Sequence, residues 1–290
     1  MNAHQFVAEQ ALSSDLINTI VLLSVFTIGA LIYLLRVLFL GRAQYERTDK
    51  EKGSALLNKG FMEMGYWMMQ PVGRLFVVLH ISPNVISWMS LFWAIVAGAC
   101  LAYGHFGFGA AFATISALMD LLDGMVARLT SCASDAGEVL DASIDRYVEF
   151  FFLAGLAVFY RENAVLLVLT LLALMGCFMV SYSTAKAEAL KVEVPRGNMR
   201  RTERAVYLIL GAALSPITIP WERLKLEESF GIPMVIALGI VSVLANVSAI
   251  ERLTALAQKI RINEKKNKIH NHEKEQSNVH GEECKAFKTK

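Results

Sequence analysis

Residues 120–145 of the chain read DLLDGMVARLTSCASDAGEVLDASID. Six carboxylates stand in this helix-like stretch, and four of them fall in pairs at helical spacing: Asp120, Asp123, Asp141 and Asp145. The other two, Asp135 and Glu138, lie off this pattern. Spacings of three and four residues place side chains on one face of a helix, so each Asp pair projects from one helix face. Carboxylates at membrane depth are costly unless they pair, line water or bind ions. Oxygen-only ligand sets suit Mg²⁺ or Mn²⁺ and not zinc, so the stretch predicts a divalent-metal site.

The composition around this stretch is typical of a polytopic membrane protein. The 290 residues are 55% hydrophobic, with a mean hydropathy of +0.44. The four cysteines show no paired or C-x-x-C spacing, and three of them fall in or beside apolar segments, so we interpret these three as small buried hydrophobic residues. A lipid bilayer is therefore the expected environment, and no nucleic-acid partner is expected.

The apolar segments predict an all-α fold with seven membrane-spanning helices. Each segment is long enough to cross the hydrocarbon core of a bilayer. The predicted spans are Leu16–Leu35, Val85–Gly104, Phe108–Leu129, Ala136–Tyr160, Asn163–Leu190, Thr202–Pro220 and Ile232–Leu256.

The distribution of basic residues predicts the orientation of these spans. Residues 1–15 contain no Lys or Arg, whereas Arg36, Arg42, Arg47, Lys50 and Lys52 follow the first span directly. The segment 186–204 holds six further cations, and the tail is rich in Lys. Positive residues favour the cytoplasmic side, so we expect the N-terminus outside and the Asp stretch at the cytoplasmic face of the inner membrane.

Two segments outside the spans have distinct compositions. Residues 54–80 mix large apolar side chains with scattered charges, which favours an interfacial helix interrupted near Pro71, with a soluble linker as the alternative. Ser82 and Pro83 are typical of a helix start. From Ala257 onward the chain is polar and poor in aromatic residues, so we expect a disordered tail.

The spacing D-x2-D-G-x2-A-R-x8-G-x3-D-x3-D is met at every fixed position of residues 120–145. It resembles the signature of the CDP-alcohol phosphatidyltransferase family, and the resemblance covers about residues 54–256. It implies a six-helix core preceded by one interfacial helix, here with one extra N-terminal transmembrane helix. The implied domains are 1–53 (extra span and connector), 54–256 (transferase) and 257–290 (tail).

The resemblance also implies the chemistry. The hydroxyl of a small alcohol attacks the β-phosphorus of a CDP-linked donor, usually CDP-diacylglycerol, and CMP leaves. Two divalent ions would be held by Asp120, Asp123, Asp141 and Asp145, and Asp145 would also be the catalytic base. The positions assigned to CDP binding are Gly124, Ala127, Arg128 and Gly137. The resemblance further favours a homodimer.

The acceptor is indicated by a second pattern. Members that use inositol phosphate carry Ser-Tyr-x-Lys-x-Arg-Ala-Glu, an Arg-x-x-Arg and a closing Arg. Residues 181–188 (SYSTAKAE), 201–204 (RTER) and Arg252 match in outline. A phosphate site formed by Lys186, Arg204 and Arg252 is implied, while Arg196, Arg200 and Arg201 are interpreted as ordinary cytoplasmic charges. Thr184 and Lys186 replace the Lys and Arg of those members, and Lys lacks the bidentate geometry of Arg.

Several alternatives stay open at this point. Glycerol 3-phosphate or serine could serve as the acceptor in the same reaction. A cation transporter would also place carboxylates in the membrane, but inverted repeats and broken helices at the midplane are not evident. A scaffold protein with decayed catalysis would be expected to have lost at least one of the four Asp residues.

Overall fold

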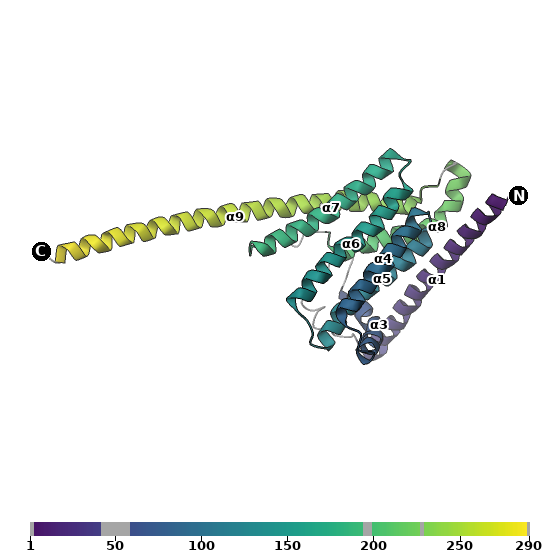
Figure 1. Cartoon of the computed structure of the whole chain (residues 1–290), viewed down its shortest axis with the longest axis horizontal. Coiled ribbons are helices and arrows are strands. Elements are labelled where there is room, and N and C mark those ends of the chain that lie inside the picture. The colour runs from purple at the N-terminus through teal and green to yellow at the C-terminus, as the bar shows by residue number, and fades with distance from the viewer. Residues whose placement is uncertain (1–2, 42–58, 194–198, 227–228, 289–290) are drawn as a thin grey trace.

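The computed structural model describes residues 3–41, 59–193, 199–226 and 229–288, and these residues form helices joined by short connections (Figure 1). The described residues confirm the predicted all-α class. The helices are α1 (Ala3–Leu40), α3 (Lys59–Val78), α4 (Pro83–Ala102), α5 (Phe106–Leu129), α6 (Asp135–Phe159), α7 (Ala164–Ala189), α8 (Arg201–Leu226) and α9 (Ile232–Lys288).

The helix starts follow from local capping chemistry. Ser82 is the N-cap of α4, with Pro83 in its first turn, although the Ser82 side chain makes no capping hydrogen bond. Ser134 Oγ accepts a hydrogen bond from the Gly137 amide at 3.2 Å and begins α6. Asn163 Oδ1 accepts one from the Leu166 amide at 3.1 Å and begins α7. The side chains of Ser134 and Asn163 thus satisfy N–H groups that a helix leaves without intrahelical partners.

The protein is a multi-pass membrane protein. Among the described helices, α1, α4, α5, α7, α8 and α9 are long and apolar enough to cross a bilayer. The 25-residue α6 fails that test because its first half carries several charges, yet it packs against α4 and α7 within the bundle. The predicted helix over Ala136–Tyr160 is therefore present, and its role as a seventh span stays a prediction.

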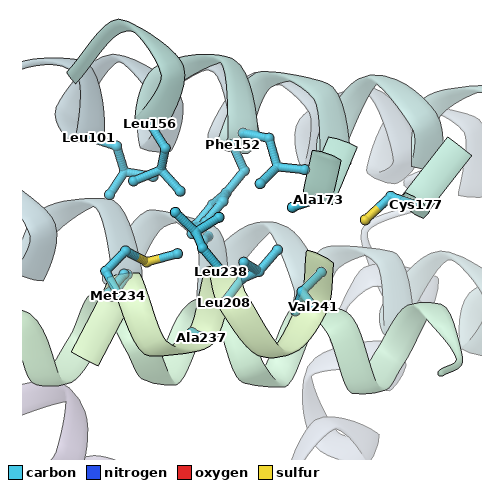
Figure 2. Close-up of a cluster of buried hydrophobic side chains, with 14 of the residues drawn as sticks. Leu101, Phe152, Leu156, Ala173, Cys177, Leu208, Met234, Ala237, Leu238 and Val241 are labelled. Atoms are coloured by element: carbon cyan, nitrogen blue, oxygen red, sulfur yellow. The ribbon is translucent and has the colours of Figure 1, made fainter. Parts of the chain in front are cut away.

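Buried apolar side chains from several helices form the main core. Figure 2 shows Leu101, Phe152 and Leu156 lying opposite Met234 and Leu238, so that α4 and α6 pack toward α9. A second, smaller cluster joins α3, α4 and α5 and consists of Tyr66, Ile86, Leu122, Met125 and Val126. This second cluster flanks Asp123, so it fixes α5, the helix that carries the first half of the Asp stretch.

The extra N-terminal helix α1 lies along the outside of the bundle (Figure 1) and is tied to it by polar contacts. Near its start, Asp15 Oδ1 accepts a hydrogen bond from the Phe108 amide at 2.9 Å, at the beginning of α5. Near its end, the Tyr33 hydroxyl lies 3.3 Å from Glu63 Oε2 of α3. The helix α1 therefore links the start of α5 to α3.

Two segments differ from the sequence-based expectations. The helix α3 runs through Pro71 without interruption, and residues 54–58 of the predicted interfacial helix lie outside the described residues. Packing of Gly73 against Met125 and Leu122 supports α3 at this point, and tertiary packing contributes more to helix stability than one backbone hydrogen bond.

The tail is the second difference, because α9 continues as one helix to Lys288 and projects far from the bundle (Figure 1). The expectation of a disordered tail after Ala257 was based on low hydrophobicity. However, Lys, Glu, Gln and Ala are favourable helix formers, and the membrane-spanning part of α9 supplies the costly helix nucleus.

The close crossing of α4 and α6 predicts a stability effect. A Cβ atom at Gly155 of α6 would collide with the Gly98 backbone of α4, which cannot move as a flexible side chain can. We expect Gly155→Ala to lower the free energy of unfolding by about 1–3 kcal/mol. Thermal unfolding of the purified protein measures the change. The control is Gly239→Ala in α9, where an added Cβ meets no atom of the described residues within 4 Å. An equal loss of unfolding free energy in both variants would contradict the close contact between Gly155 and Gly98.

Candidate active site

The helices α5 and α6 both pack against α4, and together they carry the two halves of the Asp stretch. Asp120 and Asp123 lie near the end of α5, and Asp141 and Asp145 lie in the first half of α6. A short connection joins the helices, in which Ser131 adopts a positive φ of 54° and Ser134 caps α6. The connection thus turns the chain back so that all four carboxylates are at one end of the bundle.

Three of the four carboxylates form a tight group. One oxygen from each of Asp120, Asp141 and Asp145 lies within 4.8 Å of the other two. Asp145 is buried and the other two are half-buried, so little water separates their charges. This oxygen-only set fits a hard divalent cation, which would compensate the repulsion. The chemistry of the donors therefore agrees with the predicted divalent-metal site.

Arg201 at the start of α8 contacts two members of this group. Its Nη1 atom donates to Asp120 Oδ1 and Oδ2 at 3.0 and 3.1 Å, and Nη2 lies 2.6 Å from Asp145 Oδ1. From its sequence position Arg201 is expected to be an ordinary cytoplasmic charge, but it lies within the carboxylate group. Its spacing of three residues from Arg204 puts both side chains on one face of α8. This spacing is the sequence signal that could have identified Arg201 as a site residue.

Asp123 is held separately, by α4 and by its own backbone. Its side chain is buried, and Oδ2 accepts a hydrogen bond from the Ser87 hydroxyl at 2.6 Å. Its Oδ1 accepts one from the Gly124 amide. Ser87 was not identified from the sequence, because a single serine in an apolar segment carries no distinctive pattern.

The residues predicted to bind CDP are at the same end of the bundle. Gly124 and Ala127 are half-buried in the last turns of α5, and Arg128 beside them is exposed. Gly137 lies in the first turn of α6, where an added Cβ would be 3.3 Å from Ser134 Oγ and 3.9 Å from Asn84 Oδ1 of α4. Small residues thus line the ends of α5 and α6 close to the start of α4.

The three predicted acceptor residues differ in their surroundings. Lys186 is exposed near the end of α7, and Arg252 of α9 is buried and donates to Thr184 Oγ1 at 2.8 Å. Arg204 is only 1% exposed and donates from Nε and Nη2 to Glu149 Oε1 at 2.9 and 2.6 Å. Arg252 therefore lies near the end of α7, beside Thr184, which is two residues before Lys186 in that helix. Arg204 is instead paired with Glu149 inside the bundle. Arg196 lies outside the described residues.

A family model for CDP-alcohol phosphatidyltransferases matches residues 80–248, which is more than half of the chain. The chain belongs to this family. The resemblance inferred from residues 120–145 is thereby confirmed, and so is the class of enzyme, a phosphatidyl-transferring membrane enzyme of phospholipid synthesis. All four aspartates of the stretch lie within the matched region.

Individual relatives agree with this assignment. The chain is 27% identical over 215 residues to a phosphatidylinositol phosphate synthase of Streptomyces avermitilis, covering 70% of this chain and 84% of that protein. It is 30% identical over 161 residues to the synthase of the same name from Mycolicibacterium smegmatis, covering 53% and 72%.

Solved structures show the same fold. The crystal structure of Mycobacterium tuberculosis phosphatidylinositol phosphate synthase with CDP-DAG bound superposes with a TM-score of 0.57 at 24% identity, covering 64% of this chain and 92% of that one. The structure of that enzyme with manganese and citrate gives the same TM-score and covers 87% of that chain.

The Arg204–Glu149 pair predicts a stability effect that must be separated from any role in binding. Removing one member of a buried ion pair leaves the other charge uncompensated and costs about 3–5 kcal/mol. We expect Arg204→Met to lower the melting temperature strongly, and Arg204→Met combined with Glu149→Leu to restore most of it. Thermal unfolding of the single and double variants measures this. An unchanged melting temperature for the single variant would contradict the pairing.

Proposed function

We propose that this chain transfers a phosphatidyl group from CDP-diacylglycerol to the hydroxyl of a small phosphorylated alcohol, of the inositol phosphate type, with release of CMP. The observation that carries the proposal is the convergence of Asp120, Asp141 and Asp145 within 4.8 Å at one end of a family-typical bundle. The names of the relatives support this acceptor, and the CDP-DAG complex of the structural neighbour supports the donor.

The proposed cofactor is a pair of Mg²⁺ or Mn²⁺ ions held by Asp120, Asp123, Asp141 and Asp145. When bound, such ions neutralise the diphosphate and stabilise the leaving oxygen. The manganese complex of the structural neighbour and the all-oxygen donor set of this chain support a divalent ion. Arg201 adds a fixed positive charge beside two of these carboxylates, where it can also attract the phosphate of the acceptor.

Asp145 is the proposed base for the attacking hydroxyl. Its Oδ1 lies 2.6 Å from Arg201 Nη2, and its Oδ2 lies 3.6 Å from Arg146 Nη1. We assign the incoming proton to Oδ2, because it has the longer of the two charge contacts. As that proton leaves, the hydroxyl oxygen forms a bond to the β-phosphorus of the donor. The bond from this phosphorus to the bridging oxygen breaks, and CMP departs with the electron pair.

The remaining predicted positions bind the two substrates in this proposal. Gly124, Ala127 and Gly137 allow close approach of the nucleotide, and Arg128 attracts its diphosphate. For the acceptor we propose Lys186 and Arg252, with Arg204 holding Glu149 and thereby supporting the same region. Glycerol 3-phosphate and serine are the alternative acceptors, and serine would not need these cations.

Transfer by this site should require divalent ions. EDTA should abolish CMP release, and added Mg²⁺ or Mn²⁺ should restore it. Asp123→Asn should reduce the rate by a factor of at least about 10³, because it removes a charge from the site where the diphosphate must be neutralised. Rates of CMP release in detergent measure this, with Asp135→Asn as the control, an exposed carboxylate at the start of α6. An unchanged rate of CMP release in Asp123→Asn would rule out Asp123 as a ligand of the divalent ions.

The proposed acceptor cations should affect binding of the acceptor and not of the donor. Lys186→Ala and Arg252→Ala should each raise KM for a phosphorylated acceptor at least about tenfold and leave KM for the donor nearly unchanged. The control is Lys191→Ala, another exposed lysine five residues further along. A similar change in Lys191→Ala would indicate a general charge effect, and full activity of all three variants with serine would favour the serine-type alternative.

The proposed orientation places the N-terminus outside and the active site at the cytoplasmic face, on the basis of the Lys and Arg distribution. A cysteine introduced at position 5, in a chain lacking its native cysteines, should react with an impermeant reagent added to intact cells. A cysteine at position 270 should react only after lysis, and the reverse pattern would contradict the orientation.

We also propose that the protein is a homodimer. Light scattering of the protein in detergent tests this, because it measures the molecular mass.

A further inference from the structure

We propose that Ser87 of α4 is a positioning residue for Asp123, fixing the carboxylate in the orientation in which it meets a divalent cation. This inference rests on the proposed function, because it takes Asp123 as part of the cation site. Ser87 lies well outside the 120–145 stretch and on a different helix, so the motif spacing does not include it.

The contact is short and shielded from water. Ser87 Oγ lies 2.6 Å from Asp123 Oδ2, and the two residues are only 4% and 6% exposed. The same hydroxyl lies 3.2 Å from the Pro83 carbonyl oxygen, but a serine has one hydrogen to donate. The carboxylate is both nearer and charged, so it takes that hydrogen.

The second oxygen of Asp123 is also held, by the backbone amide of Gly124. With a donor on each oxygen, rotation of the carboxylate plane is restricted. A carboxylate oxygen has more than one lone pair, so each can still accept a cation on its remaining side. A ligand that is already ordered requires less reorganisation when the ion binds, as for hydrogen-bonded carboxylates at metal sites generally.

The charge balance also distinguishes Asp123 from its neighbours. Arg201 contacts Asp120 and Asp145 and offsets part of their negative charge. The two contacts of Asp123 described above come from a hydroxyl and an amide, which orient the carboxylate but add no positive charge. Ser87 thus keeps Asp123 in place without reducing its attraction for a cation.

The chain contains a matched control for this contact. One turn further along α4, Ser90 Oγ lies 3.0 Å from the Ser116 carbonyl oxygen, and Ser116 Oγ donates to the Ser90 carbonyl at 2.8 Å. Like the Ser87–Asp123 contact, this pair is buried and joins α4 to α5. Its hydrogen bonds link the two serines and involve no carboxylate. A purely structural role for Ser87 therefore predicts that Ser87→Ala and Ser90→Ala behave alike.

The test measures cation binding without substrate. Full-length Ser87→Ala, Ser87→Thr and Ser90→Ala are purified in detergent and titrated with Mn²⁺, and free Mn²⁺ is followed by electron paramagnetic resonance. Ser87→Ala should weaken Mn²⁺ binding about 10- to 100-fold, as loss of a supporting hydrogen bond does at other metal sites. Ser87→Thr, which keeps the hydroxyl, should recover most of the affinity, and Ser90→Ala should bind as the wild type does. The Mg²⁺ concentration for half-maximal CMP release should shift in parallel.

Two results would overturn the inference: wild-type Mn²⁺ affinity in Ser87→Ala, or equal weakening in Ser90→Ala. Should Ser87→Ala fail to fold, Ser87→Cys replaces it with the same expected weakening, because a thiol is a poor donor. Failure of the wild type to bind Mn²⁺ would contradict the proposed function itself. Wild-type binding that is unaffected by any change at position 87 would contradict only the role of Ser87.

Discussion

Mutual repulsion of carboxylates in a partly dry helix bundle is the constraint on which the rest of this structure depends. Asp120, Asp141 and Asp145 offer oxygens within 4.8 Å of one another, and Asp145 is buried. Like charges this close, with little water between them, require a compensating positive charge. Arg201 supplies part of it to Asp120 and Asp145, Arg146 lies 3.6 Å from Asp145 Oδ2, and a divalent cation would add further positive charge. The carboxylate group at this end of the bundle is therefore suited to bind cations.

The surrounding helices hold this strained group in place from several sides. The close crossing at Gly98 and Gly155 fixes α6 against α4. The apolar cluster around Leu122 and Met125 fixes α5 against α3, and α1 is bound to both α3 and α5 by buried polar contacts. Because most of these contacts lie outside the motif, the rigidity needed for ordered ligands comes from the bundle and not from residues 120–145 alone.

Much of this arrangement could be predicted from the sequence, because it depends on local patterns. Apolar segments of sufficient length located the helices to within a few residues, apart from the longer α1, α8 and α9, and the Asp spacing located the carboxylate group. The contacts of Ser87 and Arg201 could not be predicted, because each joins residues far apart in sequence through tertiary packing. Likewise, the basic character of Arg204 is plain in the sequence, while its pairing with Glu149 depends on how α8 packs against α6. The helical tail was missed because low hydrophobicity was given more weight than helix propensity.

The most direct test of the account is the identity of the lipid formed by the purified protein. CDP-diacylglycerol and Mg²⁺ are combined with inositol phosphate, glycerol 3-phosphate and serine together, and the chloroform-soluble products are identified by mass spectrometry alongside CMP. The account predicts one dominant product, the phosphatidyl ester of the phosphorylated inositol, formed in equal amount with CMP. CMP release without any new phospholipid, or no CMP release with any of the three alcohols, would contradict it.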